Sequence, residues 1–180
     1  MDDILDGLLT FAAISIAAVW LVVSYNQLVA LKHRVARTWG NIDSLLRQRH
    51  DVLSRLLELC TERVAGAEQA VERAQEARGA VFAARHEQNP AALGRAEAEL
   101  RERVAELIAI GEQSPELHAN PSFAALRAQL ADLDAELEKR REDYNDAVGE
   151  NNVAVEQFPG RLIAGIGGFK PHAPLQIGHH

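Results

Sequence analysis

The sequence predicts an all-α protein, an antiparallel up-down four-helix bundle with long first and fourth helices, preceded by an N-terminal transmembrane helix. Three observations predict this fold. Alanine, leucine, glutamate and arginine are abundant, and runs of β-branched residues are few, which favours helices. No charged residue occurs from Gly7 to Leu31, and the first proline is Pro90. Further along, apolar residues recur at steps of three and four, the period of a helix with one buried face.

The predicted membrane anchor is residues 4–23, within an N-terminal segment of residues 1–24. At about 1.5 Å per residue, a helix of that length spans about 30 Å, the thickness of a bilayer's hydrocarbon core. The acidic N-terminus and the lack of a clean small-residue cleavage site argue against a cleaved signal peptide. A buried core helix would carry a polar face, which this stretch lacks.

The flanking residues favour one orientation of the predicted anchor in its membrane. Trp20 and Tyr25 suit the membrane interface at the C-terminal end of the anchor. Lys32, Arg34 and Arg37 follow closely, whereas acidic residues precede the span. By the positive-inside rule, we expect a single-pass protein that contacts membrane lipid and keeps its soluble domain in the cytoplasm.

The rest of the 180-residue chain is long enough for one domain with its own core. We expect residues 25–160 to form the helical bundle, and residues 161–180 to be an apolar segment with a loosely ordered tail. A net charge of -7 argues against nucleic-acid binding, which needs a basic face. The single cysteine, Cys60, has no partner for an internal disulfide, and we interpret it as a buried thiol.

The first helix is predicted to continue from the anchor to about Val64. Between Val35 and Cys60 its apolar residues follow the heptad spacing of a coiled-coil seam, with one gap at Arg49. The heptad spacing of apolar residues ends around Gly66, where a turn is expected.

Three further helices are predicted over residues 67–88, 91–112 and 121–158. The first two are separated by Asn89-Pro90, and Ser114-Pro115 ends the second of them. Asn120 and Pro121 suit the start of the last helix, because asparagine caps a helix and proline is tolerated at its first position. That helix carries its own heptad seam, and Pro159-Gly160 is expected to end it.

The unequal lengths of these helices predict a two-helix stalk. The second and third helices, about 22 residues each, span only about 33 Å, so residues 25–41 and 141–158 are expected to extend beyond them toward the membrane. A two-helix seam buries little, so a partner is expected to cover it. The apolar segment 162–169 is expected either to touch the lipid surface or to pack against the stalk. We place the interaction residues on this stalk: Tyr25, Asn26, Leu28, Val29, Val35, Trp39, Tyr144, Asn145, Val148, Asn152 and Phe158.

The antiparallel register predicts which residues of the two long helices meet. If position 64 faces 121 and position 27 faces 158, Arg49 lies near Glu136, and Asp43 lies near Arg141. Two ion pairs across the helices would then fill the polar gaps in the seams. If these pairs are buried, we expect them to set the register more than to add stability.

Several stretches resemble the signatures of the LemA family. They are Tyr25-Asn26-Gln27-Leu28-Val29, Trp39-Gly40-Asn41-Ile42-Asp43, Ser114-Pro115-Glu116-Leu117-His118-Ala119-Asn120, Tyr144-Asn145-Asp146-Ala147-Val148 and Gly168-Phe169-Lys170. The resemblance covers residues 25–170 in order. It implies a membrane-anchored antiparallel helical bundle without an established catalytic activity, and some relatives take part in magnetosome formation. Ser54-Arg55 stands where the family usually has Pro-Asn, so the kink that the family's proline would produce is not expected there.

Motifs for catalysis or cofactor binding do not stand out. A di-iron bundle needs Glu-x-x-His on two helices, and this motif does not occur. The run Gly165-Ile166-Gly167-Gly168 lacks the preceding strand and the following Gly-Lys-Ser/Thr of a phosphate loop. The terminal His179-His180 is interpreted as a solvated end. We therefore predict no enzyme, and no catalytic, metal-binding or cofactor-binding residue.

Two polar groups allow two interpretations each. Arg47, Arg49, His50 and Asp51 either form a binding patch or belong to a solvated face with one seam ion pair. The pairs Tyr144-Asn145 and Asn151-Asn152 either recognise a partner or set the register of the helices, as a seam asparagine does in coiled coils.

These observations favour a membrane-anchored scaffold or adaptor that oligomerises or docks another membrane protein. The alternatives are a membrane-shaping or organelle-biogenesis protein and, less favoured, a metal-binding helical enzyme.

Overall fold

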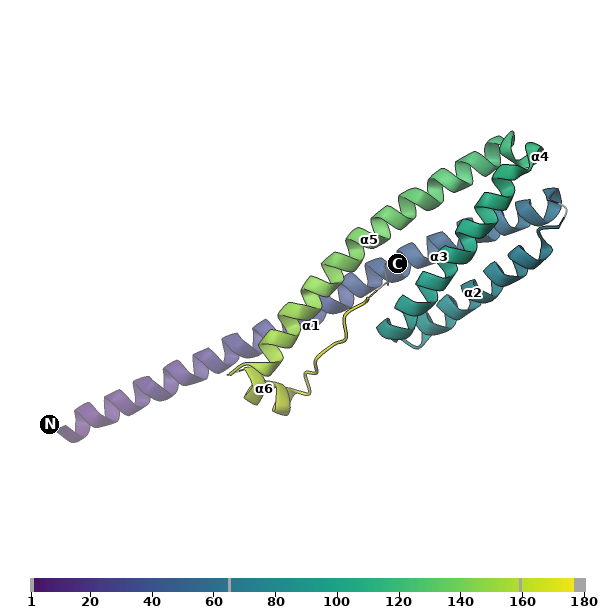
Figure 1. The fold of residues 1–180 in the computed structure, drawn as a ribbon. Helices are drawn as coiled ribbons and strands as arrows, with labels where there is room; N and C mark the ends of the chain where they lie inside the picture. The colour runs from purple at the N-terminus through teal and green to yellow at the C-terminus, as the bar shows by residue number, and fades with distance from the viewer. Residues whose placement is uncertain (1, 65, 159, 177–180) are drawn as a thin grey trace. The chain divides into compact units, whose positions relative to one another are not determined.

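The computed structural model describes residues 2–64, 66–158 and 160–176, and over these residues the protein is all-helical, without a strand (Figure 1). The chain divides into two compact units. The first comprises Met1–Arg37 and Asp146–His172, and the second comprises Thr38–Asn145 and Ala173–His180. The helices are α1 (Asp2–Arg63), α2 (Glu68–His86), α3 (Pro90–Gln113), α4 (Pro115–His118), α5 (Pro121–Glu156) and α6 (Gly160–Gly167).

The four predicted helices correspond to α1, α2, α3 and α5, and each predicted end lies within two residues of the observed one. The local signals act as expected. The Asn89 side chain accepts a hydrogen bond from the backbone N–H of Ala92 (3.1 Å), and the Asn120 side chain accepts one from the N–H of Ser122 (2.8 Å). Gly66 has a positive φ of 87° in the turn after α1, a conformation that glycine adopts without strain.

Two short helices, α4 and α6, did not follow from the sequence. The one-turn α4 occupies the predicted break after Ser114, with Pro115 at its first position. The glycine-containing α6 has weak intrinsic helix propensity, and contacts with the rest of the first unit bury Ile163 and Ala164 on one of its faces. Pro159, which was expected to end the fourth helix together with Gly160, lies outside the described residues.

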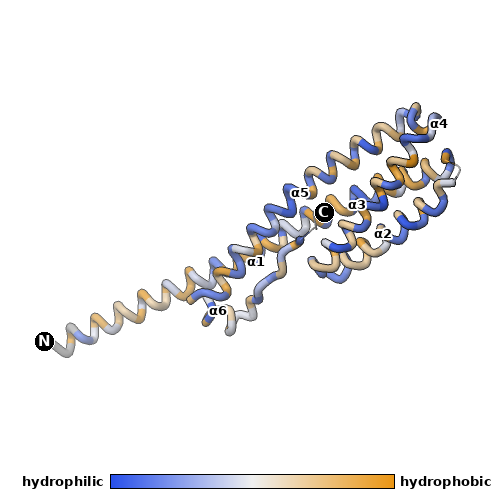
Figure 2. Tube along the Cα trace, viewed as in Figure 1, coloured by the Kyte–Doolittle hydropathy of each residue, from blue (hydrophilic) through white to orange (hydrophobic). Residues whose placement is uncertain are grey.

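The second unit has a core to which α1, α2, α3, α4 and α5 all contribute. Figure 2 shows hydrophobic and hydrophilic residues alternating along its helices, as expected for segments with one buried face. At Gly111 of α3 an added Cβ atom would lie 2.7 Å from the Phe123 ring of α5, so these two helices meet closely there. The largest fully buried apolar side chains of this unit are Ile42, Leu53 and Leu56 of α1, Leu93 and Leu107 of α3, Leu117 of α4, Phe123 and Leu137 of α5, and Leu175.

The first unit has a smaller core of its own, built where α6 and Phe169 fold back. Its buried members are Leu28 of α1, Val155 of α5, Ile163 and Ala164 of α6, and Phe169. The rings of Tyr25 and Phe169 meet edge to face with centroids 5.7 Å apart. The apolar segment therefore packs in part against the chain itself, which was one of the two expected outcomes.

Candidate functional site

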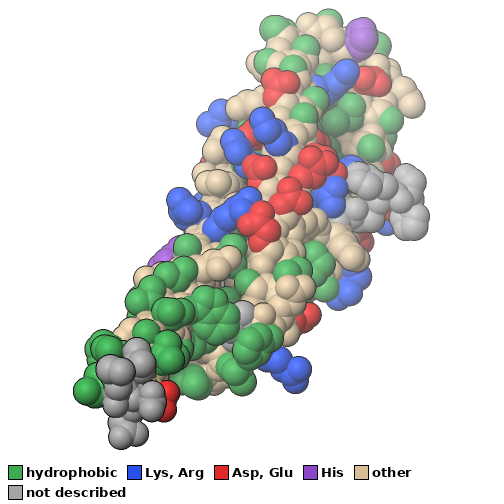
Figure 3. All heavy atoms as spheres, turned by 90° about the vertical axis from the view of Figure 1, so that its left-hand side faces the viewer, with side chains coloured by type: hydrophobic (Ala, Val, Ile, Leu, Met, Phe, Trp, Pro, Cys, Tyr) green, Lys and Arg blue, Asp and Glu red, His purple; other side chains and the backbone are tan. Residues whose placement is uncertain are grey.

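The N-terminal part of α1 is an exposed apolar helix. It holds an 18-residue window long and apolar enough to cross a membrane, and none of that window is buried. The core helix of a water-soluble protein would bury most of such a stretch. Figure 3 shows the hydrophobic side chains gathered at the end of the molecule where α1 begins. Its large exposed apolar residues include Ile4, Leu8, Leu9, Phe11, Ile14, Ile16, Val19, Val22 and Val23.

The predicted stalk residues are for the most part covered by the chain itself. In the first unit Leu28, Val35 and Val148 are buried, Val29 and Asn152 are half-buried, and Tyr25, Asn26 and Phe158 are exposed. In the second unit Tyr144 is buried, and Trp39 and Asn145 are half-buried. The chain's own core in the first unit thus covers Leu28, whereas Tyr25 and Phe158 stay exposed.

The asparagines of α5 in the first unit hold the C-terminal segment by its backbone. Asn152 donates from Nδ2 to the carbonyl oxygen of His172 and accepts from the His172 N–H, both at 2.8 Å. Asn151 is buried and donates to the carbonyl oxygen of Lys170 at 3.2 Å. A carboxamide matches a peptide group because each offers one donor and one acceptor side by side.

An asparagine side chain also binds the C-terminal backbone in the second unit. Asn145 donates to the carbonyl oxygen of Leu175 at 3.0 Å and accepts from the Leu175 N–H at 2.8 Å, and the Leu175 side chain is buried. The Tyr144 hydroxyl donates to the carbonyl oxygen of Ala173 at 3.1 Å. The amide pairs thus bind the chain's own tail, and the expectation of a loosely ordered tail was wrong for residues 170–175.

Replacing Asn145 with alanine is expected to release the segment around Leu175. The change removes two hydrogen bonds, at a net cost of about 1–2 kcal/mol, so the Leu175 amide should exchange with solvent about tenfold faster. Hydrogen-exchange mass spectrometry measures this directly. Asn41→Ala, an exposed asparagine of α1 in the same unit, is the matched control and should leave Leu175 protected. Equal protection of Leu175 in both variants would mean that the amide does not hold the tail.

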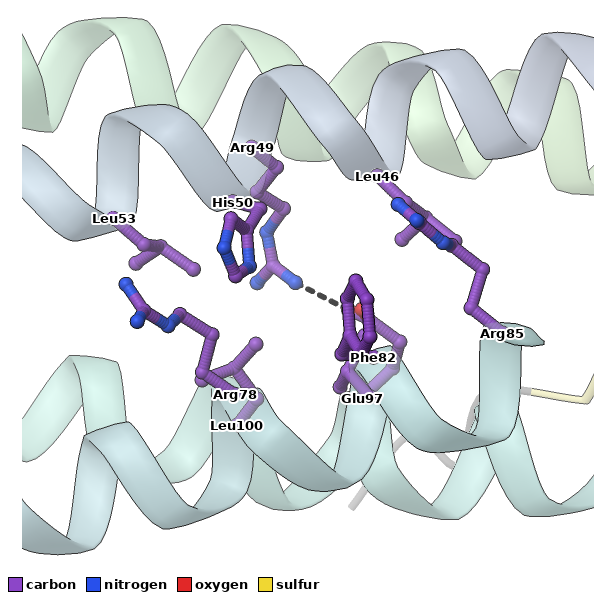
Figure 4. A pocket seen from close by; sticks show the side chains of 10 residues that line it. Leu46, Arg49, His50, Leu53, Arg78, Phe82, Arg85, Glu97 and Leu100 are labelled. Carbon is purple, nitrogen blue, oxygen red and sulfur yellow. Dashed lines mark hydrogen bonds and ion pairs between the residues drawn. The ribbon is translucent and has the colours of Figure 1, made fainter. Parts of the chain in front are cut away.

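A buried charge cluster lies in the second unit, where α1, α3 and α5 meet (Figure 4). Arg49 of α1 is 3% exposed, and its Nη1 donates to Oε2 of Glu97 on α3, which is 2% exposed. The Nε atom of Arg49 lies 2.7 Å from Oδ1 of Asp134 on α5, an ion-pair distance without hydrogen-bond alignment. One guanidinium therefore faces two carboxylates.

Both predicted cross-helix pairs were wrong. Arg49 faces Asp134, about half a helical turn from the expected Glu136, and Glu136 instead pairs with Arg140 on its own helix. Asp43 pairs with Arg47 at 2.6 Å and with Arg85 of α2 at 3.2 Å, whereas Arg141 pairs with Glu138. The pairing rule considered only the two long helices, and it left out the acids and bases that α2 and α3 bring to the same core.

The electrostatics of the cluster follow from its burial. Burial raises the pKa of Glu97, because a charge there loses its hydration, and the nearby Arg49 offsets part of this effect. Burial, together with the neighbouring Arg78, lowers the pKa of His50.

Cys60, outside this cluster, is buried as predicted. Burial raises the pKa of its thiol to about 11, so it is not a reactive thiolate at neutral pH.

The space beside the cluster is too small for a substrate. Its volume is about 10 Å³, room for one water molecule, whereas ligand pockets span roughly 300–1,000 Å³. Arg47 and Asp51 are exposed while Arg49 is buried, so these residues do not form one binding patch. Among the described residues, no group of three or more histidine, cysteine, aspartate and glutamate side chains is placed to hold a metal ion; the terminal His179-His180 lies outside them.

Comparison with known proteins identifies the family. The model of the LemA family matches residues 38–180, most of the chain. The chain belongs to the LemA family. This confirms what the motifs on α1 and α5 predicted. Magnetosome proteins MamQ 1 and MamQ 2 of Paramagnetospirillum magneticum and MamQ of Magnetospirillum gryphiswaldense are each 31% identical to it over 64 residues. That match covers 36% of this chain and 24% of each relative, so it spans about a quarter of their length.

Proposed function

We propose that this LemA family protein is a single-pass, membrane-anchored scaffold of a bacterial inner membrane. Its antiparallel helical bundle would lie in the cytoplasm and act, without catalysis, through self-association or by docking another membrane protein. The observation that carries the proposal is the continuity of α1, Asp2–Arg63. One uninterrupted helix contains both the exposed, span-length apolar segment and buried core residues of the second unit.

Open grooves beside α5 support a docking role for the second unit. One, of about 470 Å³, lies between α1 and α5, and another, of about 450 Å³, lies between α3 and α5. Small side chains such as Ala125 and Ala128 line them, which lets the backbone of another helix come close. Because most of the predicted stalk residues are buried or half-buried, we propose these grooves, in place of the stalk seam, as the docking surface.

Placing a charge in the groove between α1 and α5 tests this proposal. Ala125 is exposed, so Ala125→Glu should fold normally and weaken self-association or crosslinking to a membrane partner about tenfold, equivalent to about 1.4 kcal/mol. Ala80→Glu, an exposed alanine of α2, is the control. The measurements are the molar mass of the full chain in nanodiscs and crosslinking in native membranes. Two results would contradict the proposal: equal association of both variants, or release of the wild-type chain from membranes by alkaline carbonate.

A second candidate function is a membrane-shaping or organelle-biogenesis role. The similarity to magnetosome proteins favours it, as do the exposed apolar residues of the first unit near α6. Vesicle morphology in the presence and absence of the full chain distinguishes this role from docking alone.

A further inference from the structure

The corner between α5 and α6 presents apolar side chains to the outside. Phe158, in the corner, is 76% exposed, and Leu162 and Ile166 on α6 are 63% and 92% exposed. Leu162 and Ile166 are four residues apart and so share one face of α6. Ile163 and Ala164 on another face are buried in the core of the first unit, so burial of α6 leaves this outward face uncovered.

The corner lies against the apolar segment of α1. The rings of Phe158 and Trp20 have centroids 6.0 Å apart, and Trp20 belongs to the run that is long enough to cross a membrane. Phe158 therefore joins the corner between α5 and α6 to the exposed apolar surface of α1. If α1 spans the membrane, lipid surrounds Trp20, and the same lipid then contacts Phe158.

Basic side chains accompany the apolar ones. Arg161 on α6 and Lys170 after it are both exposed. Lys32 of α1 lies with its Nζ 5.9 Å from the centre of the Phe169 ring, next to the core that holds α6. A short helix with an apolar face and flanking cations is suited to the interface of a bilayer that contains anionic headgroups.

We infer that Phe158, Leu162 and Ile166 form a second lipid contact, which inserts into the headgroup region of the same membrane that α1 crosses. Arg161 and Lys170 face anionic phospholipid headgroups there. This inference rests on the proposed membrane anchor and adds a partner, an anionic phospholipid surface, for α6. The contact would hold the corner at the membrane, so the chain meets the bilayer at two places.

Spin-label accessibility of the full chain in vesicles of phosphatidylcholine and phosphatidylglycerol tests the inference. Cys60 is buried, so labels attach to cysteines introduced at Ile166, at Ile14 in the apolar segment, and at Gly149. Gly149 is an exposed α5 position of the same unit, where an added Cβ meets no atom within 4 Å. The label of Ile166→Cys should be several-fold more accessible to oxygen, relative to a water-soluble nickel reagent, than that of Gly149→Cys. Arg161→Gln combined with Lys170→Gln should reduce this difference.

Each outcome decides between the anchor and the lipid contact. If the label at Ile14 is in lipid and the label at Ile166 is in water, the anchor stands and the second contact is wrong. If both labels are in water, the proposed anchor itself fails, and the inference fails with it. If the label at Ile166 is shielded from both reagents, a protein covers α6 in place of lipid, which also overturns the inference.

Discussion

Replacing Arg49 with methionine is expected to lower the free energy of unfolding of the second unit by about 3–5 kcal/mol. The guanidinium is the cation that faces Glu97 and Asp134, and Glu97 is almost fully buried. Removing one partner leaves a buried carboxylate without compensation, which costs more than the lost attraction alone. Denaturant unfolding of the full chain in detergent, followed by circular dichroism, measures the change.

The same substitution at Arg47 is the matched control. Arg47 is exposed and pairs with Asp43 four residues earlier on the same helix, so Arg47→Met should change stability by less than about 1 kcal/mol. Adding Glu97→Met to Arg49→Met should recover part of the loss, because it removes the uncompensated carboxylate. If Arg49→Met costs no more than Arg47→Met, the cluster is not a buried structural element.

The limits of the four long helices, α1, α2, α3 and α5, followed from the sequence because their signals are local. A capping asparagine, a proline at the first position and an apolar period all act within a few residues, and α2, α3 and α5 begin close to where such signals placed them. The register of α1 against α5 differs from the predicted one by about two residues, as the contacts Trp39–Tyr144 and Arg49–Asp134 show. A register in which position 64 faces 121 and position 27 faces 158 places Tyr144 opposite residues 41–42, and its ring meets that of the nearby Trp39, with centroids 5.4 Å apart.

The ion-pair partners of Arg49 could not be predicted from the sequence, because they lie on two other helices, α3 and α5, whose packing against α1 must be known first. One signal was present in the sequence. Leu93, Leu100, Val104 and Leu107 follow a heptad stripe in α3, and Glu97 occupies the missing position in it. A charged residue inside an apolar stripe is expected to be buried and to need a partner, and the gap at Arg49 on the first helix offers one.

The role of Asn145 could not be predicted for a different reason. Its partners are the backbone N–H and carbonyl of Leu175, and backbone groups leave no pattern in a sequence. The amide alone was compatible with a partner protein, with register setting or with capture of the chain's own tail. Only the fold brings residues 170–175 to α5. There they contact residues of the predicted stalk that the helix lengths had suggested were exposed.

Replacing Gly160 with alanine is expected to open the corner between α5 and α6. An added Cβ atom would lie 1.8 Å from the carbonyl oxygen of Ala154, a backbone atom that no side-chain rotation can move away. The corner must therefore shift, and Ile163 then loses its packing against Leu28 and Phe169. Overpacking of this kind costs about 1–3 kcal/mol, and more where backbone is involved. Faster amide exchange across residues 160–172 in nanodiscs is the expected measurement.

Gly165→Ala in the same helix is the matched control for this opening. At Gly165 an added Cβ meets no atom within 4 Å, and alanine is favoured over glycine inside a helix by about 0.5–1 kcal/mol. This variant should therefore slow exchange in α6 or leave it unchanged, while Gly160→Ala accelerates it. Equal exchange in the two variants would mean that the close approach of Gly160 to Ala154 does not hold α6. The outward face of α6 would then have no fixed orientation, and a fixed orientation is what the proposed lipid contact requires.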